Sequence, residues 1–217
     1  MNKIYCISGL GADHRIFKKL RINDYQLVPL PWVAHSANDT IATYAIKMAQ
    51  QILEPMPIIL GVSFGGMVAL EISKLTPTKA IILVSSAKSQ AELPYHGLFW
   101  KMLVSLLPHQ FFTLPNPLII RLFGAKTSEE KKLIGDIFRE SDGRFVKWSL
   151  KAILNWHNHS VPQNLLQIHG TNDLIIPGRN VSTNHWIQGG SHIMIYNQAE
   201  QISEIINQEL DMVSTKP

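Results

Sequence analysis

Three residues whose side chains can cooperate in nucleophilic chemistry each lie in or beside a glycine-containing turn: Ser63, Asp173 and His192. A serine hydroxyl is a weak nucleophile unless a base takes its proton, and an imidazole does so best when a carboxylate fixes its tautomer. These residue types therefore predict a nucleophile, a general base and an orienting acid. Because the three residues are far apart along the chain, the fold must bring them together.

Ser63 lies within the sequence Gly-Val-Ser-Phe-Gly, directly after an apolar run that begins at Pro57. The pattern predicts a strand, a tight turn and a helix, with Gly61 and Gly65 relieving crowding so that the hydroxyl projects above the sheet edge. The free amides at the start of that helix, with Phe64 nearest, would face charge developing on a substrate oxygen. A purely structural serine is the alternative, whereas a phosphate-binding loop is disfavoured because neither Gly-x-Gly-x-x-Gly nor Gly-Lys-Ser/Thr is present.

Asp173 and His192 follow two later strand-like runs, in the sequences His-Gly-Thr-Asn-Asp and Gly-Gly-Ser-His. The carboxyl ends of parallel strands open on one crevice, so both side chains are expected on the same sheet edge as Ser63. The alternative for Asp173 is an Asx-turn that only closes the loop. His169 and His185 are rival histidines, but we place the first at the end of a strand and the second inside one.

Apolar runs alternate with segments of helical periodicity along most of the chain. Strands that are apolar throughout and separated by helices indicate a parallel sheet covered on both faces, so the pattern predicts an α/β fold. The expected strands cover residues 3–8, 26–30, 57–62, 79–85, 164–169 and 180–187. The expected helices cover residues 13–20 with Asp13 as N-cap, a segment from Asn38 or Asp39 to Leu53, and residues 66–74 and 198–212.

Residues 87–160 interrupt the alternation with helical segments and no strand-like run. We expect one domain, residues 1–217, in which residues 87–160 form a helical lid inserted before the last two strands. Thr127 resembles the start of a capping box, and Ser141 or Asp142 can begin a further helix. The lid's large apolar residues are expected mostly to form its core, with some lining a cavity above the nucleophile: Phe99, Trp100, Leu103, Phe111, Phe112, Trp148 and Trp156.

The composition is that of a compact globular protein, with 46% hydrophobic and 17% charged residues in a chain of 217. The formal net charge is +4, and the basic residues are scattered, so we expect no nucleic-acid partner. Cys6 is the only cysteine, which excludes an intramolecular disulfide and fits a reducing, cytoplasmic compartment. His157 and His159 lack a carboxylate partner nearby, so we expect no metal site.

The longest apolar stretch, residues 98–112, contains Lys101 and Pro108 and cannot span a bilayer. The lid also carries no strong basic face, so we expect no stable membrane insertion. The pattern does not predict an oligomeric state.

The three motifs together resemble those of the α/β-hydrolase fold superfamily, and the expected strand order accounts for nearly the whole chain apart from the lid. The resemblance implies a three-layer fold with about six mostly parallel strands. It also implies that Ser63 is the nucleophile, His192 the general base and then acid, and Asp173 its orienting partner. No cofactor is implied.

The resemblance also implies an oxyanion hole made by the backbone amides of Leu10 and Phe64. Members of the family often have His-Gly in the first of these loops, where this chain has Ser8 before Gly9. The implied function is a serine hydrolase acting on a small, partly apolar carboxylic ester or related acyl compound. An acyltransferase or lyase on the same triad, and a non-catalytic ligand-binding or interaction protein, are the alternatives.

Overall fold

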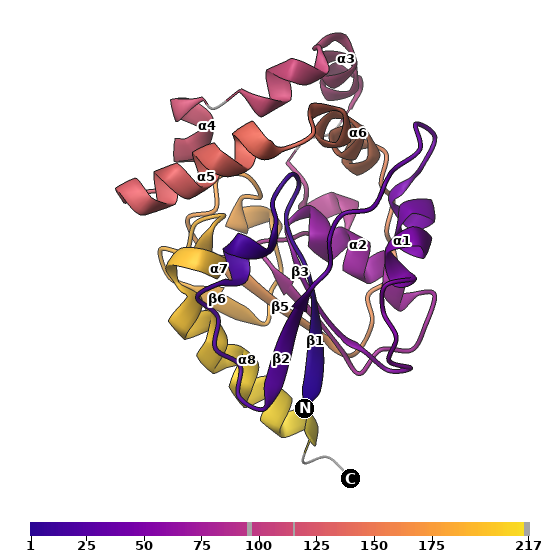
Figure 1. Cartoon of the computed structure of the whole chain (residues 1–217), viewed down its shortest axis with the longest axis vertical. Helices are drawn as coiled ribbons and strands as arrows, with labels where there is room; N and C mark the ends of the chain where they lie inside the picture. Colours follow the sequence, from indigo (N-terminus) through magenta and orange to yellow (C-terminus); the bar gives the residue numbers. More distant parts are fainter. Residues whose placement is uncertain (95–96, 115, 215–217) are drawn as a thin grey trace.

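The computed structural model describes residues 1–94, 97–114 and 116–214, and Figure 1 shows their arrangement. Six strands form one sheet in the order β2-β1-β3-β4-β5-β6, and every neighbouring pair is parallel. The expected parallel sheet of six strands is confirmed. The strands are β1 (Asn2–Ile7), β2 (Tyr25–Pro29), β3 (Ile58–Val62), β4 (Ala80–Val84), β5 (Leu165–Gly170) and β6 (His185–Ile187).

Helices cover both faces of the sheet, as the uninterrupted apolar strands require. Alternate strand residues point to opposite faces, so Tyr5 and Ile59 pack with one group of helices while Ile4 and Leu60 pack with another. The first group is α1 (Ile41–Ala49) and α2 (Phe64–Ser73). The second is the 3₁₀ helix η1 (His14–Phe17), α7 (Met194–Asn197) and α8 (Ala199–Ser214). The α/β layering is therefore confirmed.

Two of the expected helices differ from the observed ones. Asp13 does cap a helix by accepting from the Arg15 amide at 2.9 Å, but this is the short 3₁₀ helix η1 and does not continue to residue 20. Helix α1 begins after Thr40, not after Asn38 or Asp39, because Thr40 and Thr43 form a reciprocal capping box. Asp39 instead binds Lys47, at 2.6 Å. Helix α1 ends at Ala49, where tight turns replace the expected continuation to residue 53.

The last strand is also shorter than the expected residues 180–187. Residues 178–180 form the 3₁₀ helix η4 (Gly178–Asn180), and β6 contains only His185–Ile187. The cause is local side-chain bonding, since Asn184 Oδ1 accepts from the Gln167 amide at 2.8 Å. A side chain thus occupies a position that a backbone carbonyl would take in a longer strand.

The lid segment, residues 87–160, lies between β4 and β5 in the chain and at the end of the molecule remote from the two termini (Figure 1). Thr127 forms the expected capping box with Glu130, and Asp142 caps the next helix through the Arg144 amide. The helices of the segment are α3 (Leu98–Leu106), α4 (Pro117–Leu122), α5 (Ser128–Glu140) and α6 (Gly143–Leu154), with the 3₁₀ helices η2 (Gln90–Glu92) and η3 (His109–Thr113).

The expectation that the large apolar residues form the lid core holds for Trp148 and Trp156, which are buried, but is wrong for Phe99 and Phe111. These two side chains are 64% and 48% exposed. The reason is that α3 packs through the opposite side of the helix, where Val104 is buried. No helix in the described ranges has both the length and the apolar character needed to cross a bilayer.

Candidate active site

Ser63 occupies a strained corner between β3 and α2. Its backbone has φ 52° and ψ −120°, a left-handed conformation that costs a non-glycine residue free energy. Two contacts with the strand alongside hold it there: the Ser63 amide donates to the Val84 carbonyl at 3.1 Å, and Ser86 Oγ donates to the Ser63 carbonyl at 2.6 Å. The neighbouring strand therefore fixes the direction in which the hydroxyl projects.

Close backbone approach explains why glycines flank this corner. A β-carbon on Gly61 would lie 2.5 Å from the Gly65 carbonyl oxygen, and one on Gly65 would lie 2.2 Å from the Ser8 carbonyl oxygen. Both distances are far below van der Waals contact, and the atoms met are backbone atoms that cannot rotate away. Glycine is therefore required at both positions, as the sequence pattern indicates.

The structure brings Ser63, His192 and Asp173 into one hydrogen-bonded chain. His192 Nε2 lies 3.0 Å from Ser63 Oγ, and His192 Nδ1 lies 2.8 Å from Asp173 Oδ2. His192 and Asp173 are buried, with 4% and 3% of their surface exposed. The imidazole therefore bridges the hydroxyl and the carboxylate through its two different nitrogens, which is the arrangement that proton transfer from Ser63 requires.

The turns that carry the acid and the imidazole are bonded directly to each other. The Asn172 amide donates to the Gly190 carbonyl at 2.9 Å, and the Gly189 amide donates to Thr171 Oγ1 at 2.8 Å. A β-carbon on Gly170 would lie 2.2 Å from the Gly190 carbonyl oxygen. The glycines of both motifs thus allow two loops to meet and to set the spacing between His192 and Asp173.

Asp173 is held as a carboxylate. Its Oδ1 accepts from the amides of Ile175 and Ile176 at 2.8 and 2.9 Å, while Oδ2 faces His192. Burial by itself raises the pKa of Asp173, but the charge and hydrogen bond of His192, the Ile176 amide and nearby His169 outweigh it and hold the pKa below its usual value. A charged Asp173 can therefore stabilise a protonated imidazole.

His169 is a second, fully buried histidine beside the acid. Its Nε2 lies 2.8 Å from the Ile176 carbonyl oxygen and 3.6 Å from Asp173 Oδ2, and its Nδ1 has no hydrogen-bond partner. Nε2 therefore donates to Ile176, and Nδ1 is left as an unprotonated acceptor. Burial lowers the pKa of His169, so the ring is neutral and steadies the turn that supplies the amides to Asp173. The sequence analysis placed His169 only at the end of a strand.

The loop that contains Leu10 passes directly beside Ser63. A β-carbon on Gly9 would lie 3.6 Å from Ser63 Cβ. Ser8, which stands where relatives of the fold often have histidine, donates from its hydroxyl to the Ala12 carbonyl at 2.6 Å, and Trp32 Nε1 donates to the same carbonyl at 3.1 Å. The hydrogen bond from Ser8 to Ala12 thus closes residues 8–12 into a turn. The role of the Leu10 and Phe64 amides as oxyanion donors stays a prediction.

Two separate parts of the lid segment contact the site. Phe123 presents its ring to His192 in a T-shaped contact with centroids 5.3 Å apart, and its carbonyl accepts from the Ile193 amide at 3.2 Å. On the other side, Ser141 Oγ lies 2.7 Å from the Gly11 carbonyl oxygen and 2.5 Å from that of Ile137, so its one hydroxyl hydrogen is shared between the two. The lid segment therefore contacts both the histidine loop and the loop after β1. No sequence pattern marks Phe123, because its contact joins residues far apart in the chain.

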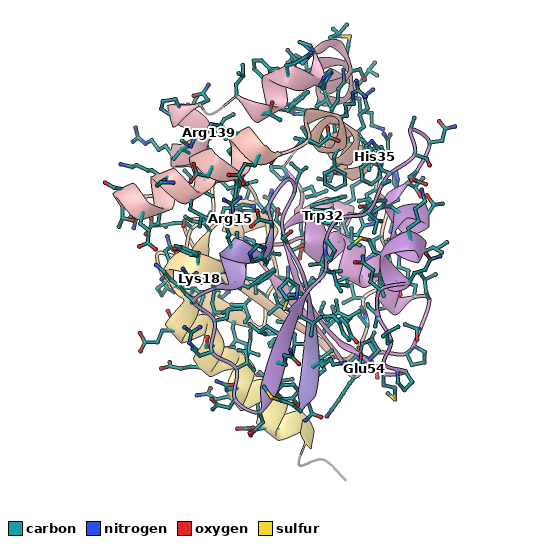
Figure 2. All side chains as sticks on the ribbon, in the orientation of Figure 1. Arg15, Lys18, Trp32, His35, Glu54 and Arg139 are labelled. Atoms are coloured by element: carbon teal, nitrogen blue, oxygen red, sulfur yellow. The ribbon has the colours of Figure 1, made fainter. Side chains whose placement is uncertain are left out.

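Aromatic rings pack around Phe64, the residue that follows Ser63. Trp32 lies 5.4 Å from the Phe64 ring and 5.2 Å from the Phe145 ring of α6, between centroids. Figure 2 labels Trp32 and His35, which follow β2; His35 lies beside α6, and Trp32 lies lower in the view. His35 stacks on Trp148 with centroids 4.9 Å apart. Rings from the loop after β2, from α2 and from α6 thus pack against one another.

A cavity of about 540 Å³ lies elsewhere, between the start of α1 and α6, and its lining includes Glu71, Trp148 and Trp156 but not Ser63 or His192. We therefore do not assign it to the chemistry of Ser63.

Within the described ranges, no three His, Cys, Asp or Glu side chains gather in a way that could hold a metal ion.

No protein-family model matches this sequence, and no sequence among the curated proteins matches it. Solved structures do resemble it. An esterase from Exiguobacterium antarcticum has a TM-score of 0.75 at 16% identity, over 99% of this chain and 92% of that one. A candidate lipase from Acinetobacter baumannii has a TM-score of 0.76 at 17% identity, over 99% and 85%. The N-acyl homoserine lactonase AidH, bound to N-hexanoyl homoserine lactone, has a TM-score of 0.74 at 13% identity, over 100% and 92%.

These similarities extend over nearly the whole of each chain, at identities that carry information about fold alone. They agree with the six-stranded parallel sheet and its α/β layering. This chain has the α/β-hydrolase fold.

Proposed function

We propose that the chain is a serine hydrolase that cleaves a small, partly apolar carboxylic ester or related acyl compound. The single observation that carries the proposal is the hydrogen-bonded chain from Ser63 through His192 to Asp173, at 3.0 and 2.8 Å. Such a chain supplies an activated hydroxyl, a general base and a charge that stabilises the protonated base. The similarity to structures of an esterase and a lactonase supports the same class of reaction.

In the first half of the reaction, Ser63 Oγ attacks the acyl carbon while His192 Nε2 takes the hydroxyl proton. The carbonyl oxygen becomes an oxyanion, which the amides of Leu10 and Phe64 stabilise by hydrogen bonding. Asp173 stays ionised and stabilises the imidazolium. The tetrahedral intermediate then expels the alcohol, which receives the proton from His192 Nε2, and the acyl group remains on Ser63.

In the second half, water takes the place of the departed alcohol. His192 Nε2 removes a proton from the water, the hydroxide adds to the acyl carbon, and the second tetrahedral intermediate collapses. Ser63 Oγ leaves with the proton from His192, and the carboxylic acid is released. An acceptor alcohol or thiol in place of water would give acyl transfer by the same steps, so the products formed in the presence of such acceptors distinguish the two reactions.

The expected substrate is small, because aromatic rings occupy the space beside Ser63. The ring of Phe64, which follows Ser63, packs against the rings of Trp32 and of Phe145 from α6. The leaving group must lie next to His192 Nε2, because it receives a proton from that atom. The ring of Phe123, from the lid segment, contacts the His192 ring. Both parts of the substrate therefore face apolar surface, which disfavours strongly charged acyl or alcohol groups.

The test is turnover of a short-chain p-nitrophenyl ester by the wild type and by Ser63→Ala. We expect a fall of about 10⁴-fold or more, the scale observed when a triad nucleophile is removed. Ser73→Ala is the matched control, because this serine is on the same helix, bonds only to the Leu70 carbonyl and does not contact the site. Equal activity of wild type and Ser63→Ala, after removal of contaminating esterases, would refute the proposal.

A fluorophosphonate probe separates a catalyst from a binding protein of the same fold. Labelling of the wild type and of Ser73→Ala, with none of Ser63→Ala, indicates an activated hydroxyl. A folded wild type that the probe does not label would favour the non-catalytic alternative.

A further inference from the structure

The exposed apolar side chains of this protein are concentrated on one part of the lid segment. Among the described residues, sixteen large hydrophobic side chains are exposed, and seven of them fall between Leu98 and Leu118. These seven residues, which we call the lid patch, are Leu98, Phe99, Met102, Leu106, Phe111, Leu114 and Leu118. A gathering of exposed apolar side chains on one segment favours a site of interaction, whereas single exposed hydrophobic residues are ordinary.

Helix α3 is the centre of the lid patch. Its residues Leu98, Phe99, Met102 and Leu106 follow helical spacing, and the first, second and fourth are 79%, 64% and 75% exposed. The helix packs inward through Val104, so its solvent-facing side is as apolar as the side that packs on the protein. Figure 1 shows α3 and α4 at the end of the molecule farthest from the termini, where neither terminus covers them.

The charges within the stretch of chain that carries the lid patch have one sign. From Leu93 to Ser128 the chain has three cationic side chains, Lys101, Arg121 and Lys126, and no Asp or Glu. Arg121 and Lys126 are exposed, and Lys101 is partly exposed. Apolar side chains with cations at their border are complementary to a lipid surface with anionic headgroups, where the rings and aliphatic chains enter the acyl boundary.

We infer that the lid patch binds reversibly to anionic lipid surfaces, with α3 lying in the interface and no segment crossing the bilayer. The sequence analysis expected no stable membrane insertion, because the lid carries no strong basic face; the exposure of the lid patch is the observation that favours binding at the lipid surface. The inference goes beyond the proposed function and does not depend on it, because binding of the lid patch to lipid needs no reaction at Ser63.

A second copy of this chain fits the lid patch less well. A two-fold contact would bring Lys101 and Arg121 of one copy near those of the other, without an acidic residue from the same region to pair with them. Three acidic side chains of the adjacent helix α5 are already in ion pairs within the chain: Glu129 with Lys19, Asp136 with Lys132 and Arg139, and Glu140 with Arg15. The fourth, Glu130, is buried and accepts from the backbone amides of Lys126 and Thr127.

The experiment measures sedimentation of the full chain with vesicles, either of phosphatidylcholine alone or of phosphatidylcholine with phosphatidylglycerol. Ether-linked lipids are used so that the proposed hydrolase reaction cannot consume them. We expect binding to the anionic vesicles that weakens as salt is raised, and weaker binding to the neutral ones. Ser63→Ala should bind as the wild type does, so a failure of this inference is separate from a failure of the proposed function.

Two variants test which residues bind. Leu98→Gln/Phe99→Gln/Leu106→Gln keeps helix propensity and should weaken binding by at least about 100-fold, since three exposed apolar side chains no longer enter the lipid. Lys101→Gln/Arg121→Gln should weaken binding to anionic vesicles by roughly 25-fold, about fivefold for each cation. The matched control replaces exposed hydrophobics outside the lid segment and should bind as the wild type does: Leu53→Gln/Met56→Gln/Leu75→Gln.

The inference is overturned if the folded wild type sediments with neither kind of vesicle, or if the lid-patch variant binds as tightly as the control. A concentration-dependent dimer in analytical ultracentrifugation that disappears in the lid-patch variant, together with no vesicle binding, would assign the surface to a second copy instead. Thermal unfolding of each variant checks that it is folded, and the charge variant, which alters only surface cations, tests the inference even where the apolar variant is unstable.

Discussion

His169→Gln should change how the stability of the protein depends on pH. His169 is fully buried, its Nε2 donates to the Ile176 carbonyl at 2.8 Å and its Nδ1 has no partner. A glutamine side chain places an N–H at nearly the position of Nε2 and does not titrate. The substitution thus keeps the hydrogen bond to Ile176 and removes only the proton equilibrium.

The sign follows from the direction of the pKa shift. Burial lowers the pKa of His169 from 6.5, although Asp173 and Glu92 raise it in part and His192 lowers it further. The ring is therefore neutral in the folded state at pH values where the unfolded chain is already protonated. The contribution of His169 to stability is complete above about pH 6.5 and is lost as the pH falls from there through the folded-state pKa.

The size of the effect is set by one proton. Between the two pKa values, unfolding takes up one proton at His169, and the free energy of unfolding changes by about 1.4 kcal/mol per pH unit. We expect the wild type to lose as much as about 1.4 kcal/mol relative to His169→Gln between pH 7.5 and 5.5. Other titrating groups cancel in this difference, because both proteins contain them.

The assay is urea unfolding followed by circular dichroism at half-unit steps from pH 8 to pH 5, with both proteins in the same buffers. A difference in unfolding free energy that is constant over this range would refute the reasoning, because it would mean that His169 titrates alike in both states. A difference that grows in favour of the wild type on acidification would mean that His169 becomes a cation paired with Asp173.

Three further substitutions test the site. Asp173→Asn should lower kcat by about 10⁴-fold in the ester assay while leaving the fold intact by circular dichroism, because the imidazole of His192 loses the carboxylate that fixes its tautomer. Gly65→Ala should destabilise the protein by about 3 kcal/mol or more in urea unfolding, since its β-carbon would lie 2.2 Å from the Ser8 carbonyl oxygen. Phe123→Leu should lower kcat by roughly 2–10-fold with little change in unfolding free energy. Leucine keeps an apolar side chain at this position but loses the T-shaped ring contact that orients the His192 imidazole.

The sheet could be predicted from the sequence because its signal is local. Runs such as residues 79–85 are apolar throughout, and each is separated from the next by a segment of helical spacing. The position of Ser63 could be predicted for a steric reason, since only glycine fits at positions 61 and 65. The capping box at Thr127 was also local, because the side chains that bond, Thr127 and Glu130, are three residues apart.

The rest of the site depends on contacts between distant residues, which no local pattern contains. The T-shaped contact of Phe123 with His192 and the bond from Ser141 to Gly11 both join the lid segment to loops at the edge of the sheet. The last strand was predicted too long because residues 180–187 include several with strand propensity, while the side chain of Asn184 takes a pairing position on β5.

The lid patch shows that sequence periodicity does not reveal whether the apolar face of a helix is buried or exposed. Apolar residues at positions 98, 99, 102 and 106 have the spacing of one helix face. This spacing is the same whether that face packs on the protein core or is exposed at the surface. Val104 makes the difference, because it places the opposite side of α3 against the protein. The lid segment thus contacts the loops of the site through Phe123 and Ser141, while the apolar stripe of α3 is exposed. A surface that engages α3 would act on a segment that already contacts the His192 loop and the loop after β1.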